Sequence, residues 1–255
     1  MPANPPLRLF PAALHFWADA ASRVGRLAAT RALLAAIWEF VRDSTPSRLR
    51  QRYSDADYDW DHRVNTTSGA VGWRDRLLGA FHSAYQPTDP AGFREMFDAL
   101  AAHVHLDFRD FTFLDLGSGK GRTLLMASDY PFRRIVGVEL LPALHQIAQE
   151  NLRDYKNETQ QCFALESLCA DATTFPFPGE SLVVYLFNPF GESDFRRVVS
   201  NLEQSLRANP RPLYLLYYNP LLEHVLAESG FLHKLTGTHQ YSVWQGKASQ
   251  AAERV

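Results

Sequence analysis

The stretch of the chain that is richest in chemistry is residues 115–122, D-L-G-S-G-K-G-R. Glycines at three alternate positions let the backbone turn sharply and approach a ligand without side-chain obstruction. A helix is expected directly after them, and the free N–H groups at a helix N-terminus attract anionic or polar groups. The stretch therefore predicts a ligand-binding loop between a strand and a helix.

The spacing of the glycines separates this loop from two well-known phosphate-binding patterns. The P-loop needs G-x-x-x-x-G-K-[ST], but Gly121 follows Lys120 and Leu114 stands five positions before Gly119. The dinucleotide pattern G-x-G-x-x-G fails as well, because position 122 is a bulky arginine. An acid nevertheless ends the next expected strand: Glu139 lies 22 residues beyond Gly117, suited to accept hydrogen bonds from both hydroxyls of a ribose.

Further polar residues follow the later expected strands. In an open parallel sheet, ligands bind outside the carboxyl ends of the strands, so these positions are candidates for the site. Asp171 is either a ligand-binding acid or the start of a turn. Asn188-Pro189-Phe190 is either a functional loop or a turn with a core phenylalanine, and Asn219 either lines a substrate site or belongs to a turn.

Alternating short apolar runs and helical patterns would position these residues. Strands are expected at 111–116, 135–138, 167–170, 182–187 and 213–218, and helices at 91–102, 123–128, 144–155, 195–206 and 221–229. Such alternation predicts a parallel sheet with helices on both faces. The runs at 231–235 and 241–245 have no helix between them, which predicts a final antiparallel hairpin.

The N-terminal part has a different character. Apolar residues recur every three or four positions from Leu14 to Val41, which predicts a helix that ends at Ser44-Thr45-Pro46. Residues 1–53 hold eight arginines against three acidic residues, a net charge of +5, so the rest of the chain carries −7. We expect the helix to pack on the protein, with peripheral membrane contact by residues 10–43 as the alternative. Residues 53–73 are expected to be a loop, either a solvated connection or a lid over an active site.

Composition limits the class of protein. The chain has 255 residues, 46% of them hydrophobic, and a net charge of −2, which excludes collagen-like, wholly disordered and uniformly basic nucleic-acid-coating proteins. We therefore predict no specific nucleic-acid partner. Cys162 and Cys169 form no disulfide framework, no histidine lies in a ligand cluster with cysteine, and no apolar run near the N-terminus could cross a bilayer. These features predict a cytoplasmic protein without a metal.

Taken together, the motifs resemble those of the class I S-adenosylmethionine-dependent methyltransferases across residues 81–255. F-L-D-L-G-S-G-K-G-R is similar to their first motif and G-V-E-L to their second. A-D-A (170–172) is similar to their adenine-side acid, and L-F-N-P-F-G (186–191) to the motif after their fourth strand. The core also resembles the non-SET lysine methyltransferases, which have a similar Y-Q-P-T segment (85–88), and a group of bacterial methyltransferases that share P-F-R-R-I-V-G-V-E-L.

The resemblance implies a Rossmann-like seven-stranded, mostly parallel α/β sheet with a C-terminal antiparallel hairpin (residues 81–255), preceded by an N-terminal helical extension and lid or cap segment (residues 1–80). It also implies S-adenosyl-L-methionine as the cofactor. The cofactor-binding residues that it implies are Tyr85 and Thr88 over the methionine moiety, Asp115 at the methionine end, Gly117, Ser118, Gly119 and Gly121 in the loop, Glu139 at the ribose, and Asp171 at the adenine. The resemblance also implies that Asn188 binds either the acceptor amine or the cofactor, and that Phe190 lines the channel through which the methyl group is transferred.

The sequence thus predicts a methyltransferase that acts on an amine acceptor of the lysine type, within a protein or a small molecule. Three alternatives stay open: a small-molecule O- or N-methyltransferase, a nicotinamide-dependent oxidoreductase, and a non-catalytic cofactor-binding module recruited through the basic N-terminal segment. The glycine spacing opposes the oxidoreductase.

Overall fold

A computed structural model of the chain describes residues 56–66 and 87–247, together with positions 14, 17–18, 21, 25–27, 29–31 and 33–34. Most of the described positions before residue 35 are helical. The expected continuous helix is interrupted at Gly25, whose φ of 85° is a left-handed conformation that suits glycine. The Trp17 Nε1–H donates to Thr30 Oγ1 at 3.0 Å across this interruption.

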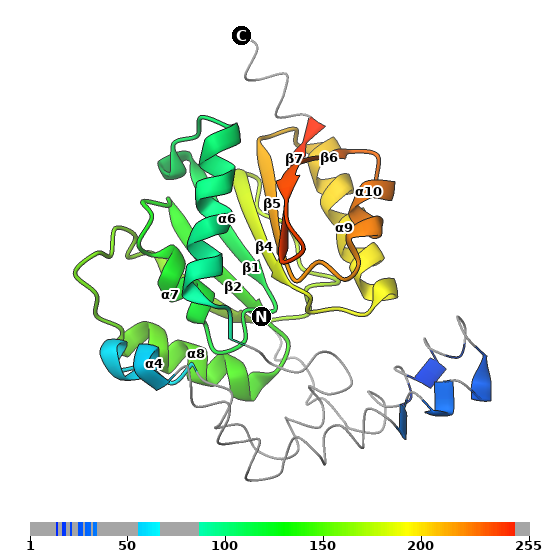
Figure 1. Ribbon diagram of the computed structural model, residues 1–255, viewed down its shortest axis with the longest axis horizontal. Helices are drawn as coiled ribbons and strands as arrows, with labels where there is room; N and C mark the ends of the chain where they lie inside the picture. The colour runs from blue at the N-terminus through cyan, green and yellow to red at the C-terminus, as the bar shows by residue number, and fades with distance from the viewer. Residues whose placement is uncertain are drawn as a thin grey trace.

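A seven-stranded sheet forms the centre of the protein (Figure 1). Its strands are β1 (Phe111–Leu116), β2 (Arg134–Glu139), β3 (Leu165–Cys169), β4 (Ser181–Phe187), β5 (Leu213–Tyr218), β6 (Leu232–Gly237) and β7 (Tyr241–Gly246). Their order is β3-β2-β1-β4-β5-β7-β6, with the first five strands parallel and β7 antiparallel to both of its neighbours. The predicted Rossmann-like sheet with a C-terminal antiparallel hairpin is confirmed.

The central strands are nearly continuous apolar runs because both of their faces are covered. All six residues of β1 are buried, and β4 reads S-L-V-V-Y-L-F with only its two end residues partly exposed. The helices that cover them are α6 (Pro90–His103), α7 (Arg122–Ala127), α8 (Pro142–Asp154), α9 (Glu192–Ala208) and α10 (Glu223–Glu228), together with the short 3-10 turn η2 (Phe108–Asp110).

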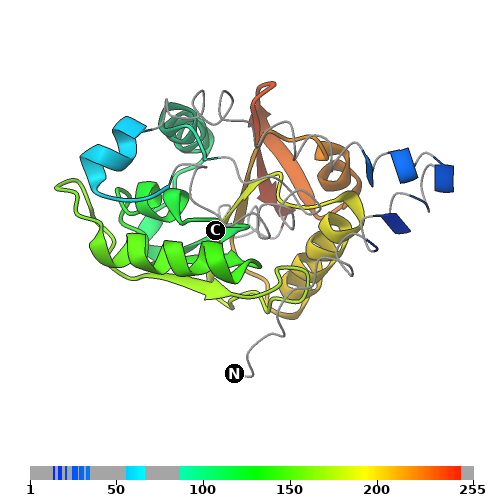
Figure 2. The same ribbon diagram turned by 90° about the horizontal axis from the view of Figure 1, so that it is seen from below.

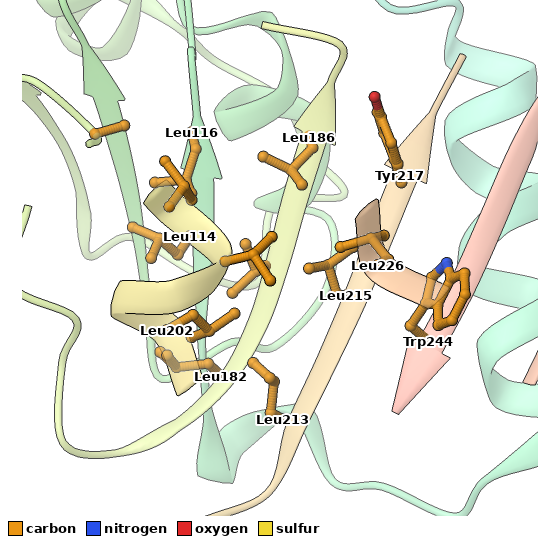
Figure 3. Packing of buried hydrophobic residues seen from close by; sticks show 14 of the residues in the cluster. Leu114, Leu116, Leu182, Leu186, Leu202, Leu213, Leu215, Tyr217, Leu226 and Trp244 are labelled. Atoms are coloured by element: carbon orange, nitrogen blue, oxygen red, sulfur yellow. The ribbon is translucent and has the colours of Figure 1, made fainter. Parts of the chain in front are cut away.

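Two apolar clusters fill the two faces of the sheet. Aromatic residues dominate the face under α6 and α7, where the Phe97 ring stacks on Tyr130 with centroids 4.3 Å apart. Leucines and valines dominate the face under α9 and α10, where Leu202 of α9 packs on Leu114 and Leu182 (Figure 3). Seen from below, the sheet lies between α6, α7 and α8 on one side and α9 and α10 on the other (Figure 2).

The expectation of a loop over residues 53–73 is wrong for one part of this stretch, because Ala56–His62 forms helix α4. Two aromatic residues four positions apart, Tyr58 and His62, lie on the same side of this turn, with ring centroids 4.5 Å apart. His62 also contacts Tyr155, which follows α8, at 5.5 Å. Helix α4 therefore packs against Tyr155, which is distant in the sequence, and the local sequence pattern gave no sign of this contact.

The expected domain boundary at residues 80 and 81 lies outside the described residues, as does Tyr85. No helix in the described part of the chain is long and apolar enough to span a membrane.

Candidate functional site

The glycine loop connects β1 to α7 at the carboxyl edge of the sheet. Gly117, Gly119 and Gly121 have φ values of 88°, 56° and 83°, all in the left-handed region where glycine is favoured. The backbone N–H groups of Gly117 and Ser118 donate to the carbonyl oxygen of Val138 at 2.8 and 3.1 Å. The loop is therefore fastened to the end of the neighbouring strand β2.

Gly117 also brings the loop against the segment that follows β4. A Cβ atom at Gly117 would lie 2.6 Å from the Cβ of Pro189, closer than real Cβ contacts occur. Only glycine therefore lets Pro189 pack on the loop, so residues 115–121 and 188–190 form one continuous site.

Asp115 lies at the base of this site with only 2% of its surface exposed, and its carboxylate accepts a hydrogen bond from the Thr123 hydroxyl. The pKa of Asp115 is raised to about 7, mainly by burial; the Thr123 hydrogen bond opposes the rise, and the nearby Glu139 charge adds to it. A cationic group placed beside Asp115 would favour its ionised form.

Glu139 ends β2, and its carboxylate binds the glycine loop directly. Its Oε2 accepts from the Gly119 N–H and its Oε1 from the Leu141 N–H, both at 2.8 Å. Burial raises the pKa of Glu139, and the backbone N–H donors oppose that rise. Each carboxylate oxygen retains capacity for a second donor, such as a hydroxyl.

Thr88 belongs to the described part of the Y-Q-P-T segment. It precedes α6, which begins with Asp89 as its N-cap, the Asp89 side chain accepting from the Gly92 N–H at 2.8 Å. The Thr88 hydroxyl is buried and lies 2.8 Å from the Tyr185 hydroxyl on β4. Tyr185 is paired in register with Asp115, so the structure brings Thr88 close to the predicted methionine end of the site.

Asp171 lies two residues beyond the end of β3, where Cys169 is paired with Glu139. Its Oδ1 accepts from the Thr173 N–H at 2.8 Å and from the Thr173 hydroxyl at 2.7 Å. This hydrogen bonding is typical of an Asx turn. The turn and a ligand-binding role are compatible, because a carboxylate has a second oxygen.

The segment after β4 contains both predicted catalytic residues. Asn188 has a left-handed backbone, with φ of 44°, and its Oδ1 accepts a hydrogen bond from the Tyr217 hydroxyl at 2.9 Å. Phe190 is partly buried on the apolar cluster under α9, with its ring stacked on Phe195 at 6.3 Å between centroids. Asn188 is thus oriented by a neighbouring strand, while Phe190 anchors the segment to the core.

Several residues that support the site were not singled out from the sequence. Lys120, in the glycine loop, is fully buried, and its Nζ donates to Asn65 Oδ1 at 3.1 Å. Burial lowers the pKa of Lys120 to about 8, and the Asp59 charge acts in the opposite direction. The guanidinium of Arg122 lies 4.4 Å from the centre of the Tyr58 ring. These contacts join α4 and the residues after it to the loop.

The sequence held few signals for these partners, because they come from distant segments. Asn65 is 55 residues before Lys120, and Tyr217 is 29 residues after Asn188. No group of three or more histidine, cysteine, aspartate or glutamate side chains that could hold a metal occurs among the described residues.

Comparison with known proteins adds an independent finding. Residues 113–209 match the family model described as a methyltransferase domain. A search of curated proteins found no match.

Solved structures similar to the chain include three methyltransferases. An RNA methyltransferase from Salinibacter ruber in complex with S-adenosyl-L-homocysteine is 21% identical, with 63% of this chain and 92% of that chain covered and a TM-score of 0.41. A ribosomal protein L11 methylase from Lactobacillus delbrueckii subsp. bulgaricus is 11% identical, with 62% and 78% covered and a TM-score of 0.42. A SAM-dependent methyltransferase from Leishmania major is 14% identical, with 62% and 70% covered and a TM-score of 0.43.

The matched segment and the observed sheet agree: residues 113–209 carry a methyltransferase domain within the predicted Rossmann-like sheet, and S-adenosyl-L-methionine is its cofactor. The chemistry of the site fits that cofactor. A methionine ammonium and ribose hydroxyls are hydrogen-bond donors, and the site presents the two buried carboxylates of Asp115 and Glu139 beside a loop that has room for no side chain at Gly117.

Proposed function

We propose that the loop at residues 117–121 holds the cofactor, with Asp115 at its methionine end and Glu139 at its ribose. Asp171 would bind the adenine, and Tyr85 and Thr88 would cover the methionine moiety. The buried carboxylates support this assignment, since each has accepting capacity left. When bound, the cofactor supplies a methyl group on a positively charged sulfur, which is an activated donor.

The acceptor in our proposal is a primary amine of the lysine type, on a protein or a small molecule. The observation that carries it is the Asn188 carboxamide, whose oxygen is oriented by Tyr217 at the carboxyl end of β4. A carboxamide accepts hydrogen bonds from N–H groups but does not take up a proton at neutral pH. It therefore suits an acceptor that is nucleophilic when neutral, as an amine is, better than a hydroxyl that needs a base.

The chain's own residues would then act by positioning. Asn188 would orient the amine lone pair toward the methyl group, and Phe190 would limit access of water to the transfer path. Alignment of this kind contributes about 7–11 kcal/mol to lowering a barrier in favourable cases. Transfer of the amine from water to a site beside another cation lowers its pKa, so the proton leaves to solvent before the reaction.

Transfer of a labelled methyl group tests the proposed acceptor. The full chain is incubated with cofactor labelled in its methyl group and a cell extract, and the protein, nucleic-acid and small-molecule fractions are separated. We expect label in protein or in small amines, in a form stable to mild base. Label confined to RNA, or label released by base as an ester would release it, would contradict an amine acceptor of the lysine type.

A variant in the proposed cofactor site makes the same experiment specific. Glu139→Ala removes the carboxylate that would hold the ribose and that also bonds Gly119. We expect it to abolish binding of S-adenosylhomocysteine in calorimetry and to abolish labelling, with the fold checked by circular dichroism. Unchanged affinity in a folded variant would remove Glu139 from the cofactor site.

A further inference from the structure

Two asparagine–proline turns lie side by side at the carboxyl edge of the sheet. Asn188-Pro189 follows β4 and Asn219-Pro220 follows β5. The two strands are parallel neighbours in which Phe187 is paired with Tyr218, so the two asparagines occupy equivalent positions, one residue beyond the pair. Neighbouring strands are about 4.8 Å apart, so the two turns begin side by side at this edge of the sheet.

Both asparagines have the same uncommon backbone conformation. Their φ values are 44° and 49°, and only one other non-glycine residue among those that the structure describes, Arg63, has a positive φ. A residue before proline is also restricted in conformation. Strained conformations of this kind persist where the surroundings enforce them, and they concentrate at functional sites.

The Tyr217 hydroxyl connects the two turns. It accepts a hydrogen bond from the Leu222 N–H, in the segment that follows Asn219-Pro220, at 3.3 Å, and donates to Asn188 Oδ1 at 2.9 Å. Figure 3 shows this hydroxyl directed away from the packed leucines, toward the carboxyl end of β5. Burial raises the pKa of Tyr217 to about 12, so the hydroxyl keeps its proton and remains a donor.

The first turn also contacts the proposed cofactor site, because Pro189 packs against Gly117. The turns, Tyr217 and the glycine loop therefore form a continuous set of contacts. Asn219 is held from the other side, where its N–H donates to the carbonyl oxygen of Gln240 at 2.7 Å. The loop between β6 and β7 thus fixes the second turn in place.

We propose that Asn188 and Asn219 together form the amine-binding part of the acceptor site, with Tyr217 as a positioning residue that fixes the Asn188 carboxamide. Two carboxamide oxygens would accept two N–H groups of one primary amine, and the nitrogen lone pair would then be directed toward the methyl donor. This inference rests on the proposed function and extends it, since it adds Asn219 and Tyr217 to the site and gives the structural basis for selecting a primary amine.

A pair of cofactor analogues tests the proposal without knowledge of the acceptor. Sinefungin has a primary amine where the cofactor has its transferable methyl group, whereas S-adenosylhomocysteine has no group there. Calorimetry with the full chain gives the dissociation constant of each analogue, and their ratio isolates the contribution of the amine. A hydrogen bond that involves a charged group contributes enough to change affinity by about tenfold or more.

Asn219→Gly is the most informative variant, because glycine tolerates the left-handed backbone while the side chain with its carboxamide is removed. We expect it to weaken sinefungin binding by about tenfold and to leave S-adenosylhomocysteine binding unchanged. Tyr217→Phe should weaken sinefungin selectively as well, by about three- to tenfold, since one orienting hydrogen bond is lost. Tyr214→Phe is the matched control: it changes a buried tyrosine on the same strand whose ring lies in the cluster on the opposite face of the sheet, and both affinities should stay unchanged.

Each outcome has a distinct meaning. Selective loss of sinefungin affinity in Asn219→Gly and Tyr217→Phe supports the proposal. Equal changes for the two analogues, or no change in either folded variant, overturn the amine-binding role while the cofactor site stands. Failure of the wild-type chain to bind S-adenosylhomocysteine overturns the proposed cofactor site itself, and this inference with it.

Discussion

Two constraints coincide at Gly117: a left-handed backbone and contact with Pro189. Gly117→Ala should therefore destabilise the fold by more than the roughly 1–2 kcal/mol that left-handed strain alone costs. It should also abolish binding of S-adenosylhomocysteine, because Pro189 and the loop cannot both keep their places. Urea unfolding and calorimetry measure the two effects.

Gly230 provides the matched control for that variant. Its φ is 73°, but no atom lies within 4 Å of the position that a Cβ would occupy. Gly230→Ala should cost only the strain, about 1–2 kcal/mol, and leave cofactor affinity unchanged. Equal losses of stability in the two alanine variants would show that the Pro189 contact contributes nothing.

The raised pKa of Asp115 makes stability depend on pH. The pKa is about 7 in the folded protein against 3.8 for an unperturbed aspartate, so between these values the folded state binds the proton and the unfolded state does not. The contribution of Asp115 to stability is therefore fully present below about pH 4 and is lost as the pH rises to about 7. Asp115→Asn should remove this part of the pH dependence in urea titrations.

The raised pKa of Asp115 has a second consequence, which concerns cofactor binding by the wild type. The methionine ammonium is a cation, so its proposed place beside Asp115 would favour the ionised carboxylate. Affinity for S-adenosylhomocysteine should rise with pH up to about 7 in the wild type, with release of a proton on binding below that pH. A wild-type affinity that is constant from pH 5.5 to 8 would argue against contact between the ammonium and Asp115.

At the scale of elements, the sequence was a good guide to the sheet and a poor one to the contacts between distant segments. The predicted bounds of β1 and β5 match the structure, because a central parallel strand is an unbroken apolar run. The glycine loop was recognisable for a similar reason, since its signal is local. Helix α4 was missed because its support comes from Tyr155 and from the glycine loop, far away in the chain.

Long-range hydrogen bonds have no such local signal. The Asn188 carboxamide was predicted as a site residue, but nothing in an apolar strand such as L-Y-L-L-Y-Y indicates that Tyr217 orients it. The left-handed backbone at Asn188 and Asn219 was also not predictable, because asparagine before proline is compatible with several turns. The positions of polar groups were thus predictable, and their partners were not.

Asn151 of α8 shows how one element supports another. Its Nδ2 donates to the carbonyl oxygens of Lys120 and Asn65 at 2.9 and 3.0 Å, and its Oδ1 accepts from the Asn65 N–H at 2.7 Å. Asn151→Ala should cost about 2–4 kcal/mol of stability, because three hydrogen bonds are lost, one of them to the buried carbonyl oxygen of Lys120. It should also weaken cofactor binding through the loop.

Gln146→Ala is the control on the same helix, since this side chain is exposed and bonds only weakly with Glu150, at 3.5 Å. Its stability should stay within about 0.5 kcal/mol of the wild type. Thermal and urea unfolding measure both variants. A loss at Asn151 no larger than that at Gln146 would mean that the segment around Asn65 does not brace the loop.

At the scale of the whole molecule, charge is divided unevenly along the chain. Residues 1–53 carry +5 and the remainder −7. In the described segment 56–66, Tyr58 and Asn65 contact Arg122 and Lys120 of the glycine loop. We expect deletion to separate the basic segment from these contacts.

Two deletions placed on either side of residues 56–66 should have different effects. Removal of residues 1–53 should leave the affinity for S-adenosylhomocysteine unchanged, because Tyr58 and Asn65 remain in contact with Arg122 and Lys120. Removal of residues 1–66 should weaken it by about tenfold, or 1.4 kcal/mol, because buried Lys120 loses its Asn65 partner and becomes exposed to water.

Calorimetry measures both affinities, and circular dichroism checks the fold. Equal affinities in the two deletions would show that residues 56–66 do not contribute to the cofactor site. A loss already complete on removal of residues 1–53 would instead assign that contribution to the basic segment.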